Sequence, residues 1–234
     1  MRNRHEILRG ARASIPVVLA AAPFGLLFGA LAVDNGFSVF DAVLMSATIY
    51  AGASQMVGID LFGDKIAPWL IVLSIFAVNF RHILYSAVTG RQIGHWSALQ
   101  RYVGFFFLID PQFAELEKRR ESDRALSFVW YMGMAVPIYL AWIIEAWLGA
   151  VFGRLMTNPE AYGIDFLLSV YFLGLVMGFR RRPNWLLVVI VSGAVSVAAY
   201  ALIGSPWHVS IGAIAGIIAA AVIAGTPEET RTEP

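Results

Sequence analysis

Residues 79–86 read Asn-Phe-Arg-His-Ile-Leu-Tyr-Ser, and they lie inside an apolar run that extends over 67–88. The run is long enough to be a transmembrane helix, which needs about 20 residues. Arg81 and His82 stand side by side within it. A charged group at that depth is costly unless it has a partner, so the stretch should face protein or a water-filled cavity.

The polar residues of this stretch fall into two stripes on a helix. Asn79, His82 and Ser86 are spaced by three and four residues and share one face. Arg81 and Tyr85 are four residues apart and form a neighbouring stripe. Lipid would not accommodate either stripe, so the stretch is the first candidate for a solute site.

The composition is that of an integral membrane protein. The 234 residues are 59% hydrophobic and 14% charged, with a mean hydropathy of +0.69, whereas soluble domains carry about 25% charged residues. The runs are too long and too evenly apolar for the alternating strands of a barrel, so the predicted fold class is an all-α bundle. A net charge of +1 indicates no nucleic-acid partner, and the lack of cysteine excludes disulfides and thiolate chemistry.

The apolar runs predict seven to eight transmembrane helices in a single transporter domain, 1–234. The predicted spans are 15–33, 39–62, 67–88, a short fourth run at 102–109, 126–152, 164–179, 184–203 and 207–225. The fourth run is too short to cross alone and meets Asp110 and Pro111. Flanking residues lengthen it into a crossing helix, or it is a broken, re-entrant element, and the break suits a substrate or ion site as well as an ordinary helix end. The following residues, 115–124, are expected to be a charged loop.

The first span and the basic loops predict the topology. A basic segment precedes 15–33 as in a signal peptide, but the apolar run is long enough to span, which favours an uncleaved helix. With a cytoplasmic N-terminus and eight crossings, the basic segments 115–124 and 180–182 lie inside, as the positive-inside rule requires. Arg91 and Arg101 count against that arrangement.

Three further features bear on a site. Pro23 with Gly25 indicates either a packing kink or a ligand-lining break. In the second span, polar side chains recur at a spacing of four with one neighbour, and they indicate helix packing or a solute face: Ser46, Tyr50, Ser54 and Gln55. Glu145 in the fifth span is either a proton carrier or, as its position towards the interface end favours, a snorkelling residue.

A weak similarity between two segments of the chain suggests a degenerate internal repeat. The segment Pro68-Trp69-Leu70 resembles Pro183-Asn184-Trp185, and proline-interrupted spans lead both halves. The halves would be 14–113 and 125–225, with a site between them near the midplane.

The chain resembles the AzlC family, the larger subunit of bacterial branched-chain amino acid exporters, over nearly its whole length. The resemblance is carried by the segments Pro23-Phe24-Gly25 through Phe28-Gly29, Ala51-Gly52-Ala53-Ser54-Gln55, Asn79-Phe80-Arg81-His82 with Tyr85-Ser86, Gly149 with Gly153, and Gly163-Ile164-Asp165-Phe166. It implies export of apolar amino acids across the bacterial cytoplasmic (inner) membrane, a small AzlD-type membrane subunit as partner, and drive from an ion gradient. The family's Thr-Asp-Glu triplet is replaced here by Ile109-Asp110-Pro111.

These observations predict a secondary transporter without a cofactor. A zwitterionic substrate needs a cation or helix N-terminus, an anion, and an apolar pocket. The predicted substrate-binding residues are Gly25, Tyr50, Ser54, Gln55, Asn79, Arg81 and Ser86, and the predicted proton-coupling residues are His82 and Asp110. In the competing interpretation, Arg81 and Asp110 pair with each other only to compensate their buried charges. The alternatives are a non-transporting scaffold subunit and a transporter of another small zwitterion; no motif of an intramembrane enzyme or ATP-driven pump is present.

Overall fold

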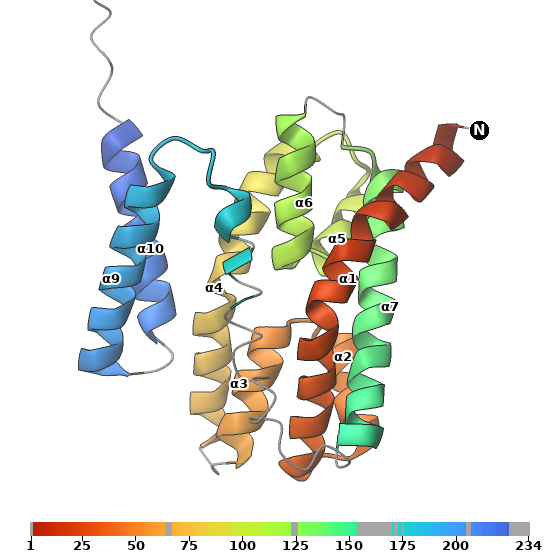
Figure 1. Ribbon diagram of the computed structural model, residues 1–234, viewed down its shortest axis with the longest axis vertical. Coiled ribbons are helices and arrows are strands. Elements are labelled where there is room, and N and C mark those ends of the chain that lie inside the picture. The colour runs from red at the N-terminus through yellow and green to blue at the C-terminus, as the bar shows by residue number, and fades with distance from the viewer. Residues whose placement is uncertain are drawn as a thin grey trace, which may run out of the picture.

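The computed structural model describes residues 2–63, 67–122, 126–153, 170, 173–174, 176–204 and 207–224. Within these residues all regular secondary structure is helical, as predicted (Figure 1). Four helices are long and apolar enough to cross a bilayer: α1 (Arg2–Asp34), α4 (Pro68–Gln92), α7 (Phe128–Phe152) and α9 (Trp185–Ile203). The expected seven to eight crossings are not confirmed, since two predicted spans are broken and 164–179 lies largely outside the described residues.

Helices α1 and α7 run in parallel and form the most extensive contact of the described fold. Glycines allow their backbones to touch: a Cβ on Gly29 would lie 2.0 Å from the Ala146 carbonyl oxygen, and one on Gly149 would lie 2.0 Å from that of Leu26. Helix α1 continues through Pro23 without a break. The break that the sequence offered as one alternative is therefore absent, and Gly29 packs against α7, while Phe24 beside Pro23 lines the pocket described below.

The predicted second span, 39–62, is wrong as a continuous helix. The chain forms α2 (Val39–Thr48) and α3 (Gly52–Gly63), which are separated at Tyr50, a residue in left-handed backbone with φ +46°. Such a conformation is uncommon outside glycine and ends the helical hydrogen-bond ladder. Ser46 and Ser54, which were expected to share one helix face with Tyr50, therefore lie on two different helices.

The fourth run is the broken element of the two alternatives. It forms α5 (Ala98–Phe106) and α6 (Asp110–Glu121), and the expected loop at 115–124 is wrong because most of it is helical. Pro111 stands in the first turn of α6, where its missing N–H costs nothing, and Asp110 complements the positive end of the helix dipole. Helix α6 runs across residue 113, where the first predicted half was expected to end.

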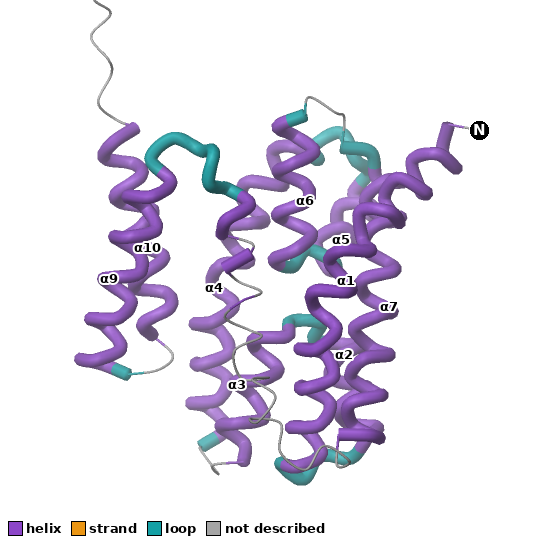
Figure 2. Tube along the Cα trace, in the orientation of Figure 1, coloured by secondary structure: helices purple, strands orange, loops and turns teal. Residues whose placement is uncertain are grey.

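Each pair of short helices folds back on itself halfway along the bundle. At 1.5 Å per residue, these helices of 9 to 12 residues are about 14–18 Å long, roughly half of a 30 Å hydrocarbon core. Figure 1 shows the α2/α3 hairpin in the lower half and the α5/α6 hairpin in the upper half. Figure 2 shows their non-helical turns facing each other at mid-height. Two hairpins thus enter from opposite ends and meet at their tips.

The remaining described helices lie beside α4. Helices α9 and α10 (Trp207–Ala224) pack on each other, and α10 contacts α4. Ser192 donates to the Gly212 carbonyl (2.8 Å), and Ser210 donates to the Ala77 carbonyl (2.7 Å). The expected spans 184–203 and 207–225 therefore agree with the structure in position.

Ion pairs join several helix ends at one end of the bundle, the upper end in Figure 1. Arg119 near the end of α6 pairs with Glu6 near the start of α1 (2.6 Å). Arg182 pairs with Glu117 (2.6 Å), whose carboxylate also accepts from Gln92 at the end of α4 (2.7 Å). Because two predicted crossings are hairpins, the basic segments remain at one end, and α4's last turn, which holds Arg91, joins them.

Candidate functional site

A small pocket lies where the two hairpin tips meet helices α1 and α7. Its volume is about 40 Å³, which accommodates only a few water molecules. Its lining residues come from all four elements: Val18, Ala21, Phe24, Tyr50, Gly52, Ala53, Ile109, Asp110, Pro111, Ile138, Ala141, Trp142 and Glu145. The wall is mostly apolar and carries two carboxyl groups.

Gln55 holds the tip of the α2/α3 hairpin. Its buried Oε1 accepts from the Ala51 N–H (3.3 Å) and from Trp142 Nε1 (3.2 Å), and its Nε2 donates to Ser46 Oγ (3.2 Å). Non-helical backbone at membrane depth needs such partners because no water is available. Ser46 and Gln55 therefore stabilise the turn itself, which is the packing role among the two that the sequence left open.

Two tyrosines of α7 donate hydrogen bonds to backbone carbonyl groups next to the two turns. Tyr139 donates to the Ala47 carbonyl of α2 (2.7 Å), and Tyr131 donates to the Gly104 carbonyl of α5 (2.8 Å). The tips are also joined to each other, since Gln112 Nε2 of α6 donates to the Tyr50 hydroxyl (2.9 Å). Helix α7 is thus the common support of both hairpins.

Asp110 lies at the tip of the second hairpin and is paired. Arg81 of α4 contacts its Oδ2 at 3.2 Å, and the Tyr85 hydroxyl donates to its Oδ1 at 2.8 Å. The Arg81 and Asp110 side chains are only 21% and 14% exposed. The Arg81 guanidinium is therefore behind Asp110 instead of in the pocket wall, as the competing interpretation of a burial pair required.

Glu145 enters the pocket from α7, and its expected position at the membrane interface is wrong. The residue is 8% exposed. Gly25 of α1 provides its space, because a Cβ there would lie 2.6 Å from Glu145 Oε2. The register of α1 against α7 thus buries a carboxyl that the neighbouring tryptophans suggested was interfacial. Gly25 acts on the site through Glu145 and does not line the pocket.

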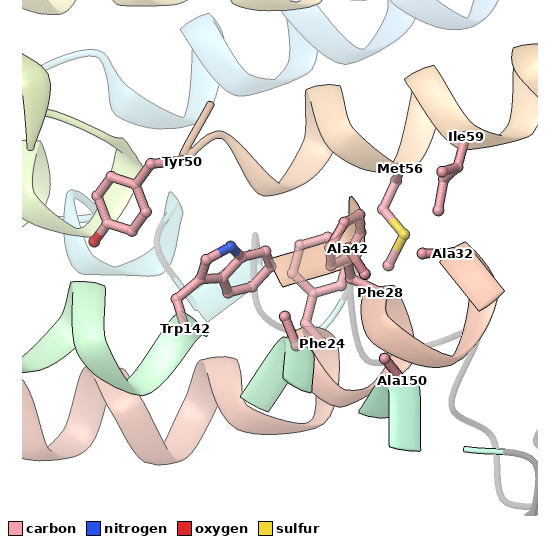
Figure 3. Close-up of a cluster of buried hydrophobic side chains, with 10 residues drawn as sticks. Phe24, Phe28, Ala32, Ala42, Tyr50, Met56, Ile59, Trp142 and Ala150 are labelled. Atoms are coloured by element: carbon pink, nitrogen blue, oxygen red, sulfur yellow. The ribbon is translucent and has the colours of Figure 1, made fainter. Parts of the chain in front are cut away.

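Aromatic packing closes the lower side of the pocket. Figure 3 shows Trp142 between Tyr50 and the pair Phe24 and Phe28. The Trp142 ring lies 5.6 Å from Phe24 and 6.1 Å from Phe28, centroid to centroid. Adjoining rings bury large apolar areas, so this wall suits an apolar group.

The other predicted site residues lie on α4 and outside the pocket wall. Ser54 hydrogen-bonds to Asn79, which fastens α3 to α4. His82 packs edge-on against Tyr85, and its buried Nε2 makes no hydrogen bond to the part of the chain that the structure describes. Ser86 is half-buried and does not line the pocket. Of the predicted residues, Tyr50 and Asp110 form the wall, and Gln55 and Arg81 support it.

The sequence analysis missed Trp142, Glu145 and Gln112 as site residues. Glu145 is the one charged residue of α7 (Phe128–Phe152), which is a signal the sequence contained. Gln112 is fully buried and links the two tips. Nothing along the chain indicates that its partner is Tyr50, 62 residues away.

Comparison with known proteins assigns the family. The sequence profile described as AzlC protein matches residues 16–156, which cover both hairpins, all of α4 and α7, and α1 from residue 16 onward. The chain belongs to the AzlC family. The resemblance seen in the sequence is thus confirmed, and the pocket lies entirely within the part that defines AzlC membership.

Relatives of this AzlC protein are named as membrane proteins. It is 28% identical to the inner membrane protein YgaZ of Escherichia coli over 95% of this chain and 94% of the relative. It is 30% identical to an uncharacterized membrane protein of Archaeoglobus fulgidus over 93% of each chain. It is 24% identical to the branched-chain amino acid transport protein AzlC of Bacillus subtilis over 74% of this chain and 69% of that protein. No solved structure matches the chain.

Proposed function

We propose that this AzlC protein exports branched-chain or related apolar amino acids across the cytoplasmic membrane, driven by an ion gradient and together with a small AzlD-type membrane subunit. The observation that carries the proposal is the amphiphilic pocket halfway along the bundle, between the tips of two opposed hairpins. Sites of secondary transporters commonly lie near the midplane, where broken helices meet.

The pocket has one feature for each part of an apolar amino acid. The carboxyl groups of Asp110 and Glu145 suit an ammonium group. Helix α3 begins at Gly52 in the pocket wall, and the N–H groups and positive dipole end of a helix N-terminus suit a carboxylate. The aromatic wall with Phe24 and Trp142 suits an aliphatic side chain.

The small volume of the pocket supports a gated cycle. About 40 Å³ is too little for an amino acid, so the pocket has to widen before it admits one. Either hairpin tip, on moving away from the other, would connect the pocket to its own end of the bundle. Two opposed hairpins therefore provide the two gates that alternating access requires.

The distribution of basic residues indicates how the chain is oriented in the membrane. The end that holds the start of α1, the end of α6 and the segment around Arg182 is the basic end, with Lys118, Arg119 and Arg120 in the last turn of α6. Short basic loops remain in the cytoplasm. We accordingly place the N-terminus inside, and a solute would be released for export at the opposite end, through the α2/α3 hairpin.

The residues of α4 complete the proposed mechanism. Arg81 pairs with the Asp110 carboxylate, and His82, which packs against Tyr85, is the second proposed proton-coupling group. An ammonium group held in the pocket would also lie near the Asp110 carboxylate and would weaken its attraction to Arg81. Binding would thus loosen the anchor of the second hairpin.

Reconstitution into proteoliposomes tests the proposal. The full chain is purified together with the small membrane protein encoded beside it, and efflux of preloaded leucine, isoleucine or valine is followed with and without a pH or sodium gradient. We expect gradient-dependent efflux, and Arg81→Ala is expected to abolish it while the protein still reaches the membrane. Absence of flux for every amino acid, with the complex intact, would support a non-transporting scaffold instead.

A further inference from the structure

The pocket holds two carboxyl groups in different electrostatic settings. Asp110 is compensated by the Arg81 guanidinium and the Tyr85 hydroxyl. Glu145 has no hydrogen-bond or ion-pair partner among the residues that the structure describes, although it is 8% exposed. An ionised carboxylate in such a place is unfavourable, so Glu145 holds either a proton or a bound cation.

The surroundings of Glu145 contain little else that titrates. On α1, residues 13–33 include no ionisable side chain. The groups facing the pocket from the hairpin tips are the Tyr50 hydroxyl, which accepts from Gln112, and the Asp110 carboxylate in its ion pair. On α2, which also packs on α7, Asp41 caps its own helix through Ser38. The charge of Asp110 is offset by Arg81, and no described cation pairs with Glu145, so burial without a partner is what disfavours its ionised form.

The packing of α1 against α7 provides the space that the Glu145 side chain occupies. Gly25 removes the Cβ that would collide with the carboxylate, so α1 and α7 pack closely around it. The carboxyl lines the same pocket as the apolar wall and the first residues of α3. A cation that enters this pocket has to pass within reach of Glu145.

We propose that Glu145 is an exchange site at which a proton and the ammonium group of the transported amino acid replace each other. The inference rests on the proposed function. In the empty pocket the side chain is the neutral acid. When an amino acid binds, the O–H bond of the carboxyl breaks, the proton leaves to the aqueous phase on the open side, and the ammonium pairs with the carboxylate. The ammonium charge takes the place of the proton at the Glu145 carboxyl, and because the substrate also brings its own carboxylate, the net charge of the pocket falls by one unit on exchange.

This competition makes the transport an antiport. One carboxyl cannot hold a proton and an ammonium group together, so each return of the empty pocket carries a proton in the direction opposite to the amino acid. Inward proton movement would then drive export. Asp110 does not take this role because its two carboxylate oxygens are already engaged by Arg81 and Tyr85.

Proton release on binding tests the inference. The complex in detergent is titrated with L-leucine, L-isoleucine and L-valine by calorimetry in buffers of different ionisation enthalpy. We expect about one proton released per amino acid bound at pH values below the midpoint of Glu145, and an affinity that rises about tenfold per pH unit there. Glu145→Gln is expected to release none and to lose the pH dependence of binding.

Controls separate the exchange from general effects of charge. Asp34→Asn removes an exposed carboxylate at the end of α1, outside the pocket, and should behave like the wild type. Glu145→Asp keeps a carboxyl and should retain proton release. Proton release in Glu145→Gln equal to that of the wild type would overturn the inference but leave the proposed function intact. If the wild type binds no aliphatic amino acid at any pH, the proposed function fails and the inference with it.

A measurement on the wild type remains decisive if Glu145→Gln does not fold. Infrared difference spectra, recorded on adding leucine, should show loss of a protonated carboxyl C=O band and gain of a carboxylate band. Gly25→Ala, which places a methyl group 2.6 Å from Glu145 Oε2, should shift or weaken that difference. A leucine-bound wild type that shows no change in its carboxyl bands contradicts the exchange.

Discussion

The two hairpins share one architecture but are anchored by different interactions. The α2/α3 hairpin turns at Tyr50 and is held by the amide of Gln55, which bonds to backbone, hydroxyl and indole groups. The α5/α6 hairpin turns ahead of Asp110 and is held by an ion pair with Arg81. Neutral hydrogen bonds do not change with protonation, whereas an ion pair does. The second hairpin is therefore the one whose anchor responds to charged solutes.

Breaking the ion pair should have the largest effect. Arg81→Ala leaves the largely buried Asp110 carboxylate without its cation and with the Tyr85 hydroxyl as its partner among the described side chains, and the expected loss is about 3–5 kcal/mol of stability. Thermal unfolding in detergent measures it. The double variant Arg81→Ala/Asp110→Ala should lose less than Arg81→Ala alone, because no uncompensated charge remains. Strictly additive losses would show that the two residues do not act as a pair.

Removing the amide anchor of the first hairpin should cost somewhat less. Gln55→Leu deprives the Ala51 N–H and Trp142 Nε1 of their acceptor in a buried place, and we expect a loss of about 2–3 kcal/mol. The matched control is Gln100→Leu, which removes the exposed side-chain acceptor of the Ser97 N–H and should cost about 1 kcal/mol or less. Equal losses in the two variants would contradict the role given to Gln55.

Filling the space at the first tip should have a smaller effect. In Gly52→Ala the added methyl group would lie 2.9 Å from the rings of Phe24 and Trp142, and overpacking of this kind costs about 1–3 kcal/mol. Gly58→Ala on the same helix is the control: its nearest neighbour, Ile75, is 3.5 Å away, so it should be neutral or stabilising. Unfolding temperatures that fall equally in both would reject tight packing at the tip.

Separating the tips from each other should have the smallest effect. Tyr50→Phe removes the hydroxyl that accepts from Gln112 and keeps the ring contacts, so about 1 kcal/mol should be lost. If this bond helps to close the pocket, the variant should also bind leucine faster in stopped-flow fluorescence. Tyr200→Phe on α9, an exposed tyrosine, should change neither quantity.

Much of the fold could be predicted because it depends on the lengths of apolar runs. The runs 67–88 and 126–152 correspond to α4 and α7 within a few residues. The break at Tyr50 could not be predicted, because 39–62 is long and apolar enough to cross and has no proline or glycine at the turn. Its partners, Gln112 and Tyr139, are 62 or more residues away in the chain.

The candidate site was predicted in part for the same reason. Arg81 and Asp110 stand out as charges in apolar runs, and their pairing is the simplest way to bury both. Glu145 stands out equally, but its depth depends on the register of α1 against α7, which Gly25 and the other interface glycines set.

The sequence by itself determined that this is a helical membrane protein of the AzlC family, because apolar run length and the segments around residues 51–55 and 79–86 require no knowledge of contacts. Only the tertiary structure decided which runs cross and which turn back, and which carboxyl is paired. A buried backbone break or charge is stable only with partners, and those partners come from helices that are distant in the chain.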